Sequence, residues 1–80
     1  MLDTRYTSVK IRVINGVPTD CWLTIQENEK PMERTTLELN KAKKLMWELV
    51  KAGGDRSIDI DDTNPKSYYY IVSHMFFWFH

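Results

Sequence analysis

The stretch YYYIVSHMFFWFH, residues Tyr68–His80, decides the fold of this chain. Ten of its thirteen residues are apolar or aromatic, seven of them are Phe, Tyr or Trp, and none carries a permanent charge. Aromatic and β-branched residues favour extended strands, and side chains of this kind are stabilised by burial. We therefore expect a long strand here, at the centre of the core that the rest of the chain builds.

Length and composition indicate one small domain spanning residues 1–80, near the lower size limit for a single core. The single cysteine, Cys21, excludes an intramolecular disulfide and fits a reducing compartment. The first residues contain no apolar run that could act as a signal peptide, and the apolar run at the other end is shorter than the roughly 20 residues needed to span a bilayer. The expectation is a soluble cytoplasmic domain with no membrane contact.

The charge balance bears on the kind of partner. Eleven basic and eleven acidic side chains give a formal net charge of zero. Proteins that neutralise phosphates carry a basic excess, so nucleic acid ranks below protein as a partner. Low net charge together with 12% aromatic residues favours self-association, and a homodimer is expected.

Two strands and a tight turn are predicted in the first third of the chain. Residues 6–14 and about 20–26 each alternate between apolar and polar side chains, and Asn15-Gly16 between them is a strong hairpin signal. A two-residue turn at Asn15-Gly16 would set residue 14 opposite residue 17, so that the numbers of all paired residues add to 31. Apolar residues of one strand would then lie opposite polar residues of the other. The apolar faces match only when the sum is even, so we expect an odd-length loop or a bulge near Val17-Pro18.

The middle of the chain predicts an exposed edge strand and one helix. The edge strand covers roughly Met32–Leu37, where charged and polar residues discourage unwanted pairing. The helix covers about 41–52, with Asn40 as N-cap and Gly53 as the residue that ends it. Its apolar residues recur at helical spacing in a single stripe that covers one sheet face: Leu39, Ala42, Leu45, Met46, Leu49 and Val50.

A short fourth strand follows at Ser57–Asp61, with Ile58 and Ile60 pointing inward. A turn then leads into the aromatic strand at Tyr68–His80. The order β-β-β-α-β-β predicts an α+β fold, in which one amphipathic helix packs on one face of an antiparallel-rich sheet.

No residue pattern predicts an enzyme, a metal site or a cofactor. Asp59 and Asp61 share a strand face and could hold Mg²⁺ only with ligands from elsewhere, so a solvated strand edge is the preferred interpretation. His74 and His80 are about 20 Å apart along a strand, too far for one metal ion. Cys21 lies on an apolar strand face, where cysteine usually packs as a small hydrophobic residue. This interpretation is preferred to a nucleophilic pair of Cys21 with His74.

One flank of the helix offers an alternative binding surface. Lys43, Lys44, Trp47 and Lys51 surround the edge of the apolar stripe, and lysines around a tryptophan could bind a phosphate backbone with a stacked base, or an acidic protein. The preferred interpretation is structural: Trp47 folds over the sheet edge, and the lysines are solvated or pair with Glu48.

The aromatic strand has two faces and the helix can cover only one. The more purely apolar set, which includes Ile71, Met75, Phe77 and Phe79, is expected under the helix. The other face is then left open, on the same side of the sheet as the polar faces of the first two strands. Its aromatic surface exceeds what a monomer normally exposes, and its residue types dominate protein interfaces. The expected docking residues are Tyr70, His74, Phe76, Trp78, Trp22, Lys10 and Arg12.

The residues therefore favour a small non-enzymatic protein-interaction module, an inhibitor or adaptor of the kind found among phage accessory proteins. No stretch matches the motif set of a known family. A nucleic-acid-binding protein that uses the helix flank, or Lys10 and Arg12 on the sheet, is the alternative. A metal-dependent enzyme at Asp59 and Asp61 is the third hypothesis.

Overall fold

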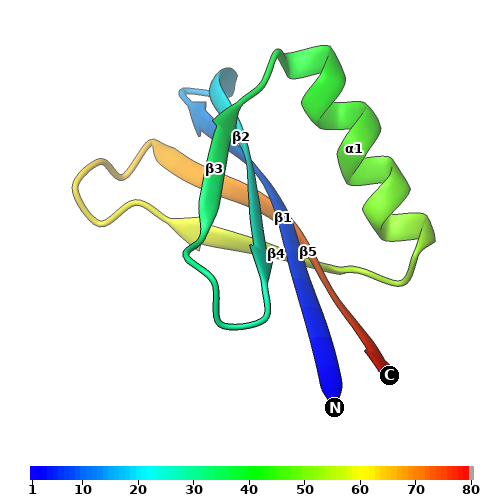
Figure 1. Ribbon diagram of the computed structural model, residues 1–80. Coiled ribbons are helices and arrows are strands. Elements are labelled where there is room, and N and C mark those ends of the chain that lie inside the picture. Colours follow the sequence, from blue (N-terminus) through cyan, green and yellow to red (C-terminus); the bar gives the residue numbers. More distant parts are fainter. Residues whose placement is uncertain (80) are drawn as a thin grey trace.

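The expected element order is confirmed by the computed structural model, which describes residues 1–79 (Figure 1). One helix packs on one side of an antiparallel sheet, and the fold is α+β. His80, the last residue of the predicted aromatic strand, lies outside the described residues. The elements are β1 (Leu2–Ile14), β2 (Val17–Glu27), β3 (Glu33–Thr36), α1 (Leu39–Lys51), β4 (Asp55–Ile60) and β5 (Ser67–Phe79).

The sheet formed by residues 1–79 has the order β3-β2-β1-β5-β4, and each neighbouring pair is antiparallel. β3 is an edge strand whose four residues are all exposed, as predicted for this segment. β1 and β5 pair over their full lengths, from Leu2 opposite Phe79 to Ile14 opposite Ser67. The aromatic strand is therefore paired on both sides for half its length and along one side for the rest.

The β1–β2 hairpin contains both the predicted turn and the predicted bulge. Asn15 and Gly16 have φ angles of +52° and +78°, as a two-residue hairpin turn with right-handed strand twist requires. The pairing register then shifts between Arg12 and Val13, leaving Thr19 as the extra residue of β2. The Thr19 hydroxyl donates a hydrogen bond of 3.2 Å to the Arg12 carbonyl. The bulge restores even-sum pairing, so the apolar faces of the two strands coincide.

Helix α1 begins earlier than predicted. The N-cap is Glu38, whose extended backbone presents its carbonyl to the Ala42 amide at 2.9 Å, and its side chain makes no capping hydrogen bond. The prediction that Asn40 caps the helix is wrong, because Asn40 already lies within the first turn. The predicted end is confirmed: Gly53 has a φ of +94°, a conformation that favours glycine after a helix.

The core lies between α1 and the centre of the sheet. Ala42 and Met46 of α1 pack against buried residues of β1, β2 and β5, as the apolar stripe predicted. Partly buried apolar residues surround this cluster, among them Leu45 and Leu49 of the same stripe. The buried apolar residues are Val9, Ile11, Val13, Cys21, Ala42, Met46 and Val72.

The face of β5 that the helix covers is the opposite of the one predicted. Val72 pairs with Val9 and Tyr70 pairs with Ile11, so the even-numbered residues of β5 lie on the helix side. The expectation that Ile71, Met75, Phe77 and Phe79 lie under the helix is wrong. Because β5 is apolar on both faces, its own pattern cannot choose between them, and its register with β1 decides.

Beyond β4 the sheet narrows into an extension, which we call the arm: residues 2–7 of β1 and 74–79 of β5. Residues 5–7 of β1 also pair with β2, whereas residues 2–4 pair with β5 alone. The last β5 residue that pairs with β4 is Ser73, opposite Asp55. The arm projects from the end of the sheet and carries the N-terminus and the described end of β5 side by side (Figure 1). It makes the molecule elongated, with extents of 46 × 24 × 19 Å.

Candidate interaction surfaces

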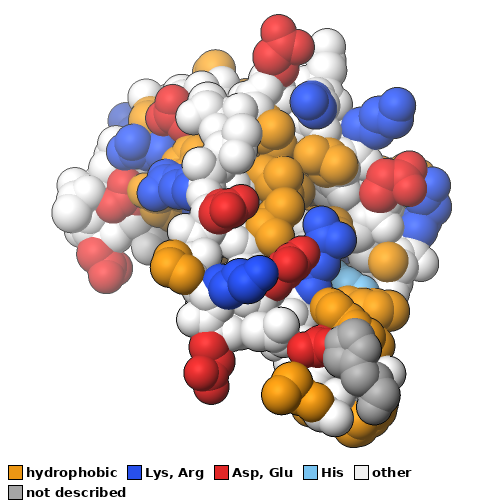
Figure 2. All heavy atoms as spheres, viewed as in Figure 1, with side chains coloured by type: hydrophobic (Ala, Val, Ile, Leu, Met, Phe, Trp, Pro, Cys, Tyr) orange, Lys and Arg blue, Asp and Glu red, His pale blue; other side chains and the backbone are white. Residues whose placement is uncertain are grey.

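The arm exposes aromatic side chains on both of its faces. Phe76, Phe77 and Phe79, the three phenylalanines of the sequence, have 54%, 58% and 80% of their surface exposed. Met75 and Leu2 are also exposed. Figure 2 shows hydrophobic side chains gathered at the end of the molecule where Figure 1 places the N- and C-termini. Clusters of this kind on a small protein mark interaction sites.

On the helix side of the arm the rings form a row. His74 and Phe76 have ring centroids 6.5 Å apart with an interplanar angle of 32°, and Phe76 and Trp78 are 5.6 Å apart at 36°. Alternate residues of a strand share a face, so this row follows directly from the sequence. Arg5 of β1 lies opposite Phe76 and pairs with Glu27 at 3.9 Å. The row can accept further rings or aliphatic side chains against its edges and faces.

The seven residues expected to form one docking face are not on one face. His74, Phe76 and Trp78 lie on the helix side of the arm, beyond the end of the helix-covered core, and Tyr70 packs against that core. The other three predicted docking residues lie on the opposite face of the sheet, with the odd-numbered residues of β5. The cause is again the register of β5 with β1, which places the even-numbered residues of β5 on the helix side. The three are Lys10, Arg12 and Trp22.

The sheet face opposite the helix is centred on Tyr69, which the sequence did not single out. Lys10 Nζ lies 5.3 Å and the Arg12 guanidinium 5.9 Å from the centre of the Tyr69 ring. Trp22 meets this ring edge-to-face at 6.2 Å, and Arg34 lies 4.4 Å from the Trp22 ring. Both rings therefore already have cations over them within the chain. A nucleic-acid base would have to displace these cations in order to stack.

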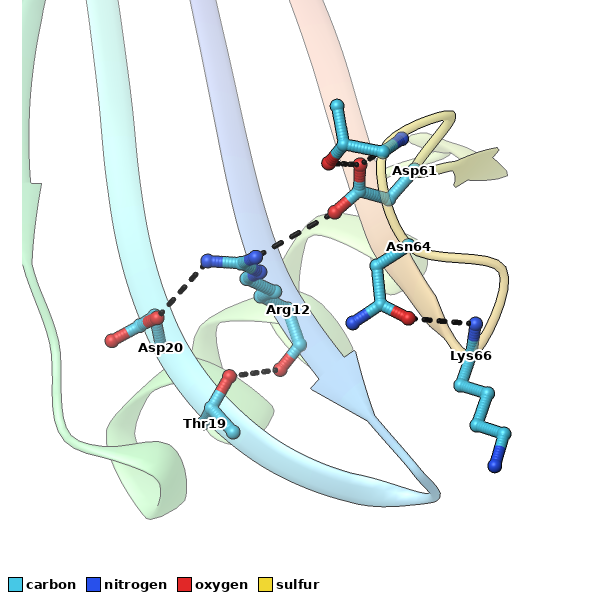
Figure 3. Close-up of polar contacts among 7 residues, drawn as sticks. Arg12, Thr19, Asp20, Asp61, Asn64 and Lys66 are labelled. Carbon is cyan, nitrogen blue, oxygen red and sulfur yellow. Dashed lines mark hydrogen bonds and ion pairs between the residues drawn. The ribbon is translucent and has the colours of Figure 1, made fainter.

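Arg12 also joins two acidic residues on this face (Figure 3). Its guanidinium lies 4.0 Å from Asp20 and 3.5 Å from Asp61. The hydroxyl and the amide of Thr63 donate hydrogen bonds of 2.6 and 3.0 Å to the Asp61 carboxylate. The Thr63 hydroxyl, then its amide, and to a lesser extent Arg12, lower the pKa of Asp61. The Asp61 carboxylate, in the turn after β4, is therefore already bound by Thr63 and Arg12.

Asp59 and Asp61 are not joined by other metal-binding side chains within residues 1–79. Asp59 pairs with Tyr69 across the sheet, while Asp61 faces Thr63 and Arg12. Within residues 1–79, no group of three His, Cys, Asp or Glu side chains is close enough to hold a metal ion. The hypothesis of a metal-dependent enzyme therefore has no geometric support in the described part of the chain.

Cys21 and His74 are separated in the fold. Cys21 pairs with Ile11 and His74 with Thr7, four residues apart on β1, which corresponds to about 13 Å along the strand. Burial, and then the charge of Asp20, raise the pKa of the Cys21 thiol. A thiol of this kind is a poor nucleophile, and it packs in the core.

The helix flank borders a groove between α1 and the β4 side of the sheet. A cavity of about 300 Å³ is lined there by Lys43, Trp47 and Arg56 over apolar residues of the core. Trp47 is 59% exposed, so it borders this groove and does not close it. Of the other lysines predicted on this flank, Lys51 pairs with Glu48 at 3.2 Å and Lys44 is exposed.

The groove continues onto β4. Ile58 lies opposite Tyr70, and Ile60 lies opposite Tyr68, so both isoleucines share the helix side of the sheet. They were predicted to point inward, but they are 60% and 74% exposed. The prediction of the face is right and the prediction of burial is wrong, because α1 packs on β1, β2 and β5 and leaves β4 uncovered.

Within the described residues, no helix is long and apolar enough to cross a membrane. Comparison with protein-family models, with curated proteins and with solved structures found no match. The function is therefore argued from the surfaces of this chain.

Proposed function

We propose that this chain is a small non-enzymatic protein-interaction module, an inhibitor or adaptor acting in the cytoplasm, which docks onto protein partners through its arm. One observation carries the proposal: the three phenylalanines of the chain stand exposed on the arm. Full burial of each would contribute about 1.5–3 kcal/mol. Phenylalanine side chains are usually buried in the protein core. Three exposed phenylalanines on one part of the surface therefore favour a surface that becomes buried in a complex.

Matched substitutions test the role of the arm. Phe77→Lys places a charge on the arm, and Met32→Lys does the same in the β2–β3 loop at nearly equal exposure, 58% against 57%. Each tagged protein is used to capture proteins from the source cell, followed by quantitative mass spectrometry. At least one protein should bind wild type and Met32→Lys equally and be lost with Phe77→Lys. Identical capture by all three proteins would contradict the proposal.

The free edge of the arm also supports a homodimer. From His74 to Phe79, β5 pairs with β1 on one side, and β4 has already ended on the other. Charged residues and proline usually prevent an edge strand from pairing with another chain. This edge segment contains neither. Two copies related by a two-fold axis could pair these edges antiparallel, since an antiparallel edge is self-complementary. The rings of both copies would then line one continuous sheet.

Nucleic-acid binding at the helix flank remains the second candidate. Trp47 is exposed, and Lys43 and Lys44 have no ion-pair partner among residues 1–79. A fluorescent single-stranded oligonucleotide tests it. Binding at 20 mM salt that falls steeply by 200 mM and is lost with Lys43→Glu and Lys44→Glu would establish this function. No binding at 20 mM salt would exclude it.

A further inference from the structure

The helix side of the sheet is only partly covered, because one helix is narrower than the five-stranded sheet of the described chain. Neighbouring strands lie about 4.8 Å apart, so the five strand axes in residues 1–79 span roughly 19 Å. A helix with its side chains is about 10–12 Å across. Because α1 packs on β1, β2 and β5, the side of the sheet toward β4 stays open.

The floor of this strip is apolar. Beside α1 it consists of apolar sheet residues, Ile11, Tyr70 and Val72, at the base of the 300 Å³ cavity. Further out, Ile58 and Ile60 continue it to the edge of the sheet, and both are mostly exposed. The strip is therefore apolar apart from Arg56, which lies opposite Val72, and it is bounded by α1 along one side.

The borders of the strip are cationic. Lys43 and Trp47 are four residues apart and share the flank of α1 that faces the cavity, and Arg56 enters it from β4. Neither Lys43 nor Arg56 has an ion-pair partner within residues 1–79. No acidic residue lines the cavity. An occupant with negative charges on its flanks would satisfy both cations, whereas a cationic one would be repelled.

We infer that the groove between α1 and β4 binds an amphipathic helix of a partner protein, with an apolar stripe and acidic flanks. The stripe packs on Ile58, Tyr70 and Val72 beside Trp47. Its acidic residues pair with Lys43 on one flank and Arg56 on the other. An amphipathic helix laid into an apolar groove is a recurrent mode of recognition, and here it completes the helical layer over the sheet. This surface is separate from the arm and does not depend on it.

Two synthetic peptides test the inference. Each is a 21-residue helix with a leucine stripe, flanked by glutamates in one peptide and by lysines in the other. Fluorescence anisotropy is measured with the wild-type protein at 20 and 200 mM salt. The glutamate peptide should bind at least about tenfold more tightly than the lysine peptide, and added salt should reduce the difference. Equal affinity for the two peptides, or no binding of either, would overturn the inference.

Charge reversal of the protein makes the test specific to the groove. The double variant Lys43→Glu with Arg56→Glu should reverse the preference and bind the lysine peptide. The control Lys30→Glu with Lys66→Glu makes the same charge change at exposed positions outside the groove and should keep the original preference. An unchanged preference in the groove variant would contradict the inference.

Two further measurements separate this surface from the others. Phe77→Lys, which disrupts the arm, should bind the glutamate peptide as wild type does. Trp47→Ala should weaken binding about tenfold or more without loss of fold, since Trp47 is mostly exposed. A single-stranded oligonucleotide that competes with the glutamate peptide would show that the groove selects phosphate, and would overturn the assignment to a protein helix.

Discussion

Asp61 illustrates how a single side chain organises the turn between β4 and β5. Its carboxylate accepts hydrogen bonds from the hydroxyl and amide of Thr63 and faces Arg12 at 3.5 Å (Figure 3). These interactions favour the charged form and hold the pKa of Asp61 below its usual range. The stability that they contribute is therefore present above the ordinary aspartate pKa, and it is lost as the pH falls through the lowered value.

Replacing Asp61 should make stability less dependent on acid pH. Asp61→Asn is expected to lower the urea midpoint at pH 7, because the charge-assisted contacts are lost, and to lose less further stability than wild type between pH 5 and 2. Urea unfolding at several pH values measures both effects. Asp62→Asn, one residue away and exposed, serves as the control and should follow wild type. Parallel pH profiles for wild type and Asp61→Asn would contradict the assignment.

Gly54 is a second residue with a specific structural demand. A Cβ at this position would lie 2.7 Å from the Ser73 carbonyl oxygen and 2.8 Å from that of Leu49, both backbone atoms. Gly54→Ala should therefore destabilise the protein by about 1–3 kcal/mol. Ser57→Ala on the exposed strand β4 should cost less than about 0.5 kcal/mol. Equal midpoints for the two variants in urea would contradict this close approach.

At the scale of elements, α1 is held by few contacts. Ala42 and Met46 are its buried residues, and Leu45 and Leu49 pack at the border of the core. The helix has no side-chain cap at its N-terminus, so tertiary packing must supply most of its stability. In a chain this small, each buried side chain is a large share of the total.

Met46→Ala should accordingly destabilise the protein by about 2–5 kcal/mol, because it leaves a cavity between α1 and the sheet. Lys44→Ala, on the exposed side of the same helix, should change stability by less than about 0.5 kcal/mol. Thermal and urea unfolding followed by circular dichroism measure the difference. A cost for Met46→Ala no greater than for Lys44→Ala would mean that the helix does not pack as described.

At the scale of the whole molecule, the arm determines the elongated shape, and it is the surface through which we propose that the chain associates. It extends the sheet beyond the part covered by α1, and its apolar surface is one that a lone copy cannot bury. Large aromatic side chains can each bury about 150–250 Å². The exposed parts of Phe76, Phe77 and Phe79 from two copies amount to roughly 600–950 Å² at most, below the about 1,200 Å² of standard interfaces, so the backbone hydrogen bonds of the paired edges must contribute as well.

Sedimentation equilibrium should therefore show a concentration-dependent species of twice the 9.5 kDa chain mass. Phe77→Lys should shift this equilibrium toward the monomer by tenfold or more in the dissociation constant, because two lysines would meet near the two-fold axis. Met32→Lys should sediment as wild type does. A wild-type monomer at all concentrations would exclude the dimer and leave docking of the arm onto other proteins to be judged by the capture experiment.

Local patterns in the sequence determined most of the fold. Alternation defined the first two strands, Asn15 and Gly16 defined the turn, and the parity of the two apolar faces required the bulge found at Thr19. Helical spacing placed Ala42 and Met46 in the core. Each of these features depends on residues close together in the chain, so the pattern itself carries the information.

Only the tertiary structure decided what the aromatic strand Ser67–Phe79 does with its two faces. A strand that is apolar on both faces has no alternation, and its pairing with β1 chooses between them by setting Val72 against Val9. The same long-range pairing left Phe76, Phe77 and Phe79 on an arm beyond the reach of α1, and it surrounded Tyr69 with cations. The sequence determined that this strand is too aromatic for the chain to bury alone. The register and the limited width of one helix determined which of its residues remain exposed.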